Sequence, residues 1–97
     1  MITHIVLFRL TDRSVGNIAR AADVLSGLRG RVPVLRHLEV GTDVVRSERS
    51  YDVALVAKFD SLDDLRAYQM HPAHLEVVKY MNSVRDASVA VDYETRD

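Results

Sequence analysis

The chain has 97 residues, 47% of them hydrophobic and 28% charged, with a formal net charge of -1 at pH 7. This length suits one small domain, residues 1–97, and the scattered charges include no basic block that could grip phosphates, so we expect no nucleic-acid partner. The absence of cysteine excludes disulfides, thiolate metal ligands and a cysteine nucleophile.

The cellular location is predicted from the lack of targeting signals. No apolar stretch approaches the ~18 residues that a membrane-spanning helix requires. The N-terminus goes straight into an apolar run, without the charged start and small-residue cleavage site of a signal peptide. We therefore expect a cytoplasmic protein that does not associate with membranes.

Apolar periodicity divides the chain into strands and helices. Alternation with a period of two indicates a strand, and apolar residues three and four positions apart indicate a helix. In chain order we predict a strand at 4–10, a helix at 12–30, strands at 34–44 and 51–60, helical segments at 61–70 and 72–84, and a strand at 87–94. The first strand is apolar on both of its faces, so we expect it to be covered on both sides.

The order strand, helix, strand, strand, helix, strand predicts an α+β fold. It is the ferredoxin-like βαββαβ arrangement, a four-stranded antiparallel sheet with its helices on one face. The other face then carries apolar residues, namely Ile5, Leu7, Ala54 and Val56. Because a bare apolar face on a soluble protein marks an interface, we expect a homodimer whose sheets pack face to face.

The segment His71-Pro72-Ala73-His74 interrupts the second helical region. Pro72 disfavours a helical backbone at His71 and suits the first turn of a new helix. His71 is therefore well placed to accept a backbone N–H as a helix cap. His74 falls in the first turn, where the helix dipole disfavours a cation, so its imidazole stays neutral and able to accept a proton.

The residues alone leave several interpretations of the histidines open. Zinc requires three or four ligands, and His4 and His37 lie on strands that need not aim them at one point, so we predict no metal. A lone histidine such as His74 is more often a hydrogen-bonded structural group than a catalytic base. Tyr68 shares a helix face with Leu65, as a core aromatic residue would.

Three segments resemble the stress-responsive α/β-barrel (Dabb) domain family, the dimeric α+β barrel group. They are HIVLFRL at 4–10, YDVALVAKFDSLDDLRAYQMHPAHLEVV at 51–78 and VAVDYE at 89–94. The run AYQMHPAH, followed by a terminal DY, is the most specific part of the resemblance. The resemblance implies ferredoxin-like monomers paired through their sheets into a dimeric barrel, with a pocket between sheet and helices in each monomer.

The same resemblance implies site residues. Plant polyketide cyclases of this family close a linear poly-β-keto chain by intramolecular aldol condensation, without metal or cofactor. By motif, His74 is the implied general base and Tyr68 the residue that orients the substrate. The other predicted pocket residues are His4, His71, Val6, Phe8 and Leu55.

The chain also departs from those cyclases. They carry a further histidine in the third strand, where this chain has Val53, and bulky apolar groups in the last strand, where it has Ser88 and Ala90. These differences imply a pocket of another shape. Two main hypotheses follow: a cofactor-free acid/base catalyst acting on a keto-rich or aromatic substrate, or a non-catalytic dimer that binds a small hydrophobic or aromatic molecule or has a structural role. A cofactor-independent monooxygenase is a third alternative.

Overall fold

The computed structural model describes residues 1–96 and contains the predicted elements in the predicted order. These are β1 (Ile2–Leu10), α1 (Val15–Ser26), β2 (His37–Thr42), β3 (Val53–Phe59), α2 (Leu62–Met70), α3 (Pro72–Val84) and β4 (Arg85–Glu94). None of the helices in this part of the chain combines the length and the apolar character needed to cross a membrane.

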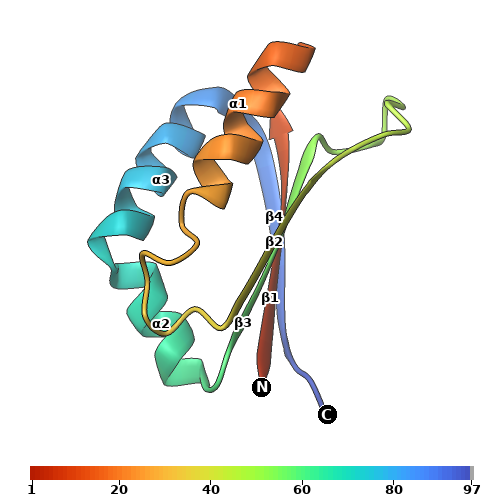
Figure 1. The fold of residues 1–97 in the computed structure, drawn as a ribbon. Coiled ribbons are helices and arrows are strands. Elements are labelled where there is room, and N and C mark those ends of the chain that lie inside the picture. Colours follow the sequence, from red (N-terminus) through yellow and green to blue (C-terminus); the bar gives the residue numbers. More distant parts are fainter. Residues whose placement is uncertain (97) are drawn as a thin grey trace.

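The strands form one four-stranded antiparallel sheet in the order β2-β3-β1-β4. In the centre of the sheet β1 pairs with both β3 and β4, so that Val6 lies opposite Leu55 on one side and Ala90 on the other. The helices lie together on one face of this sheet, with α2 leading directly into α3 (Figure 1). The ferredoxin-like α+β prediction is therefore confirmed.

The helix predicted at 12–30 is shorter at both ends. It begins after Ser14, whose hydroxyl accepts the Asn17 N–H, and Gly27 caps its C-terminus. The apolar pattern runs past this end because Leu28, in the turns that follow, is also fully buried in the core. A hydrophobic period alone thus marks what is buried and does not mark where the helix stops.

The strand predicted at 34–44 is reduced to β2. Its expected first residues belong to a turn, in which the Leu35 N–H donates to the Val32 carbonyl at 3.1 Å. The apolar pattern continues through this turn because Val34 and Leu35 are partly buried against the core. The ends of the other strands shift only slightly from the predicted ones.

The two faces of the sheet have different surroundings. The helix-covered face holds the core, in which Leu55, Ala57 and Phe59 of β3 are almost completely buried. The other face, here called the open sheet face, carries the apolar residues Ile5, Leu7, Ala54, Val56, Val89, Val91 and Tyr93, which the strand register places together. Within one chain nothing in residues 1–96 covers it, so the expectation that β1 is covered on both sides is not met by the single chain.

Candidate functional site

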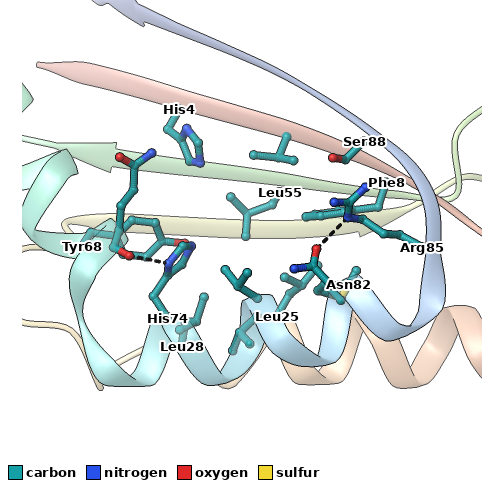
Figure 2. Close-up of a pocket in the computed structure, with 15 residues that line it drawn as sticks. His4, Phe8, Leu25, Leu28, Leu55, Tyr68, His74, Asn82, Arg85 and Ser88 are labelled. Atoms are coloured by element: carbon teal, nitrogen blue, oxygen red, sulfur yellow. Dashed lines mark hydrogen bonds between the residues drawn. The ribbon is translucent and has the colours of Figure 1, made fainter.

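A cavity of about 220 Å³ lies between the sheet and the helices. Of the predicted site residues, those that line it are His4, Val6, Phe8, Leu55, Tyr68 and His74 (Figure 2). Its volume falls below the roughly 300–1,000 Å³ of pockets for drug-sized ligands. An occupant is therefore small.

His74 lies in the first turn of α3, where its ring reaches back to α2. Its Nδ1 is 3.2 Å from the carbonyl oxygen of Gln69. Because a carbonyl only accepts, Nδ1 carries the hydrogen and the Nε2 of the neutral ring holds a free lone pair. Burial lowers the pKa of His74 and nearby His4 lowers it further, although the Gln69 carbonyl acts in the opposite direction. A neutral imidazole with a free Nε2 can accept a proton near neutral pH.

Tyr68 packs between an aromatic ring of the sheet and the imidazole of His74. Its ring centroid lies 4.9 Å from that of Phe59 and 4.3 Å from that of His74. Burial raises the pKa of the Tyr68 hydroxyl to about 12, so the group stays protonated. Within residues 1–96 every fully buried side-chain oxygen has a hydrogen-bond partner. The Tyr68 hydroxyl forms no hydrogen bond there, so it is not fully buried. Because Tyr68 lines the cavity, we infer that its hydroxyl faces the cavity. It is free to donate to a ligand.

His4 is held by a partner that the sequence analysis did not assign. Its ring is buried in β1, and its Nδ1 forms a short hydrogen bond with Oδ1 of Asp92. The carboxylate accepts this bond, so Nδ1 of His4 carries a hydrogen and the ring is held in a fixed orientation in the cavity wall. Asp92 belongs to the DY pair already noted, but its role depends on the register that sets β4 opposite β1.

His71 lies outside the cavity, which corrects its predicted place in the pocket. Its Nδ1 accepts the Ala73 N–H at 3.1 Å and caps α3, as the position before Pro72 predicted. The bond to the Ala73 N–H holds the ring at the start of the helix, and His71 is not among the residues that line the cavity. In the part of the chain that the structure describes, no group of three or more histidine or acidic residues gathers as a metal site requires.

The far end of the cavity is polar, which the sequence analysis had noted only for Ser88. Arg85 and Asn82 also line this end, and the Arg85 Nε donates to Asn82 Oδ1 at 3.0 Å. Apolar side chains lie between this end and the histidines, among them Leu25 of α1 and Leu55 of β3 (Figure 2). The cavity therefore has two chemically different ends joined by an apolar middle.

The amino-acid sequence is similar to that of a plant protein. The chain is 33% identical over 98 residues to the stress-response A/B barrel domain-containing protein DABB1 of Arabidopsis thaliana, covering 96% of this chain and 46% of that protein. It therefore spans about half the length of this relative.

Solved structures share the fold. The chain is 33% identical to a dimeric ferredoxin-like protein from Thermobifida fusca, with a TM-score of 0.84 and coverage of 97% of this chain and 90% of that one. A hydroxynitrile lyase from Passiflora edulis has a TM-score of 0.81 at 22% identity. The match covers 99% of this chain and 94% of that one, and this likeness shows the fold alone.

Residues 2–95 match the family model of the stress responsive A/B barrel domain. The chain belongs to this stress-responsive A/B barrel (Dabb) family.

Proposed function

We propose that this protein is a cofactor-free acid/base catalyst that removes a proton from a carbon next to a carbonyl group of a small keto or aromatic compound. The observation that carries the proposal is the neutral His74 ring, whose Nδ1 is occupied by the Gln69 carbonyl and whose Nε2 is left free in an apolar cavity beside Tyr68. Such a positioned base typically accelerates proton transfer by roughly 10²–10⁴-fold.

The same groups can complete an aldol ring closure like that of the polyketide cyclases. The His74 Nε2 takes the proton, and the Tyr68 hydroxyl donates a hydrogen bond to the enolate oxygen that forms. The enolate carbon then bonds to a second carbonyl carbon of the same molecule. The resulting alkoxide takes the proton back from the His74 imidazolium, so the catalyst returns to its neutral state.

The relatives are compatible with catalysis without specifying a reaction. One protein with this fold is a hydroxynitrile lyase, but its 22% identity carries no reaction over to this chain. The specific support for ring closure is the resemblance of the AYQMHPAH segment to the cyclases, together with the contact between Tyr68 and His74.

We also propose that the protein acts as a cytoplasmic homodimer. The open sheet face supports this assembly, because Val89, Val91 and Tyr93 are each about half exposed in the single chain. Apolar patches of this kind are usually interfaces. The Thermobifida fusca neighbour is described as dimeric, which supports the same assembly.

Proton exchange at a ketone tests the catalytic proposal without knowledge of the natural substrate. The acetyl protons of 4-acetylbenzamide would be followed by NMR in D₂O with the wild type, with His74→Gln, and with Leu75→Gln as the control. Leu75 neighbours His74 but is half exposed and does not line the cavity.

We expect the wild type and Leu75→Gln to accelerate exchange by about 10²-fold over an equal concentration of free imidazole. His74→Gln should fall to the level of buffer. Exchange by His74→Gln at the wild-type rate, or a wild type no faster than imidazole, would contradict the proposal.

The alternative is a binding protein without turnover, and the mainly apolar lining of the cavity is the observation that favours it. In that case phenolic or keto compounds should shift the amide NMR signals of residues around the cavity, such as Tyr68, His74, His4 and Phe8. No variant and no ligand would then show proton exchange above the imidazole level.

A further inference from the structure

The polar end of the cavity is built where α3 passes into β4. Arg85 is the C-terminal cap of α3 and has an extended backbone, so the chain turns there toward the sheet. Asn82 belongs to the last turn of α3, and Ser88 pairs with Phe8 across β1 and β4, on the cavity side of the sheet. Figure 2 shows these three side chains at the opposite end of the cavity from His4 and His74.

This end presents hydrogen-bond donors. Arginine has only donors, so the bond from the Arg85 Nε at 3.0 Å fixes the Asn82 side chain with Oδ1 toward Arg85 and leaves its NH₂ group free. The terminal nitrogens of Arg85 also remain, because Arg85 joins none of the ion pairs formed within residues 1–96. The neighbouring Asp86 instead lies 4.0 Å from Arg9. Arg85 is thus a half-buried cation that no carboxylate of the described chain neutralises.

The opposite end presents an acceptor. His74 uses Nδ1 for the Gln69 carbonyl and keeps a neutral Nε2 free, while Asp92 holds the His4 ring beside it. The lining between the two ends is apolar. A complementary ligand therefore has an anionic group at one end, an apolar body, and at its other end a carbon or hydroxyl that can give up a proton.

We infer that Arg85, with Asn82 and Ser88, is an anion-binding subsite that selects small keto carboxylates whose reactive carbon lies at His74. A carboxylate accepts two parallel hydrogen bonds from the planar fork of donors on a guanidinium group. The identity of the reactive end rests on the proposed function, whereas the anion subsite depends only on the cavity. Arg85 is here a specificity residue, since it contacts the part of the ligand that does not react.

A matched pair of probes tests the inference. Binding of 4-acetylbenzoate and of the neutral 4-acetylbenzamide would be measured by NMR titration for the wild type, Arg85→Met, Arg85→Lys and Arg66→Met. Arg66 is an exposed arginine of α2 that pairs with Asp63 and lies outside the cavity, so its variant controls for the loss of one positive charge. Amide spectra of the free variants would verify that each is folded.

We expect the wild type and Arg66→Met to bind the benzoate at least about tenfold more tightly than the benzamide, as a charge-assisted hydrogen bond would give. Arg85→Met should lose this preference while it binds the benzamide as before, and Arg85→Lys should keep part of it. A wild type that binds the two probes equally, or binds neither, would overturn the inference, as would an Arg85→Met variant that keeps the preference.

The outcomes separate the subsite from the proposed function. A preference for the carboxylate that depends on Arg85, without any proton exchange, supports the subsite and rejects catalysis. Exchange that depends on His74, with no effect of Arg85 on either probe, supports catalysis and rejects the subsite.

Discussion

The two histidines of the His-Pro-Ala-His segment have different roles because they lie on different sides of a helix start. His71 precedes Pro72 and is drawn to the free Ala73 N–H, whereas His74 lies one turn later and reaches the cavity. Proline chemistry is local, so the sequence predicted the helix cap at His71, although it also placed His71 in the pocket. The Asp92 partner of His4 is 88 positions away along the chain, and only the pairing of the first and last strands brings the two together.

The Tyr68 hydroxyl is the proposed hydrogen-bond donor to the enolate oxygen, and its removal can be tested. Tyr68→Phe keeps the ring that packs on Phe59 and His74 but removes the donor proposed for the enolate oxygen. We expect kcat for the exchange of 4-acetylbenzamide protons to fall by about tenfold to a hundredfold, with KM changing much less, because the hydrogen bond strengthens as charge develops. An unchanged kcat would show that Tyr68 only packs against its neighbours.

The helix cap between α2 and α3 should contribute to the stability of the fold. The His71 ring caps α3 by accepting the Ala73 N–H, so His71→Ala should lower the free energy of unfolding by about 1 kcal/mol. Urea denaturation measures this, with His37→Ala as the control, since His37 is exposed on β2. Equal effects of the two substitutions would mean that the cap contributes nothing to stability.

The fully buried Asp52 connects the segment before β3 to the end of β1 and to the loops that contain Arg13 and Arg46. Its carboxylate accepts from the Leu10 N–H at 2.8 Å and from Arg13 and Arg46 at 2.9 Å each. Burial on its own would raise the pKa of Asp52, but these three donors outweigh it and hold the pKa below its usual value of 3.8. The carboxylate is therefore more stable in the folded chain than in the unfolded one.

Asp52→Asn should lower the free energy of unfolding by about 3 kcal/mol near neutral pH, because it leaves two arginines without their shared partner. Since the folded pKa is the lower one, the charge-dependent part of this stability is fully present above pH 3.8 and is lost as the pH falls through the folded pKa. Urea unfolding as a function of pH measures both. A wild-type advantage that does not shrink in acid would contradict the assignment.

Sequence reasoning succeeded where the information is local and failed where it is not. The alternation in β3 and the proline before α3 are written in consecutive residues, so these elements were predicted closely. The polar end of the cavity combines Arg85, at a helix end, with Ser88, which the register with β1 turns toward the helices. Strict alternation along β4 would put Arg85 and Ser88 on opposite faces, but the register shift at Arg9 and Leu10 sets Arg85 opposite Leu10. The spacing of residues does not reveal that irregularity, which is why Arg85 was missed.

At the scale of the whole molecule, the open sheet face is the feature that one chain leaves unfinished. Leu7 lies near its middle, opposite Ala54 on one strand and Val89 on the other. In a two-fold symmetric dimer Leu7→Asp would bury two unpaired charges, which is strongly unfavourable.

Sedimentation analysis tests this assembly. We expect a dimer for the wild type and a monomer for Leu7→Asp at micromolar concentration, with the dimer weakened by at least about a hundredfold. Leu75→Asp, on the outer surface of α3, makes the same chemical change away from the sheet and should remain dimeric. A Leu7→Asp variant that stays a dimer of unchanged stability would show that the open sheet face is not the interface.

The proposed chemistry requires that His74 presents a neutral ring with a free Nε2 to the cavity. The groups that face this ring are Tyr68, His4 with its Asp92 carboxylate, and the Gln69 carbonyl. Two-dimensional ¹⁵N NMR of the histidine rings reports both protonation state and tautomer, and His74→Gln assigns the signal.

We predict that His74 carries its hydrogen on Nδ1 at pH 7 and takes a second proton only below pH 6.5, since its pKa is lowered. A ring that is charged at pH 7, or that carries its hydrogen on Nε2, would contradict the account, because neither form can remove a proton from a ligand in the cavity.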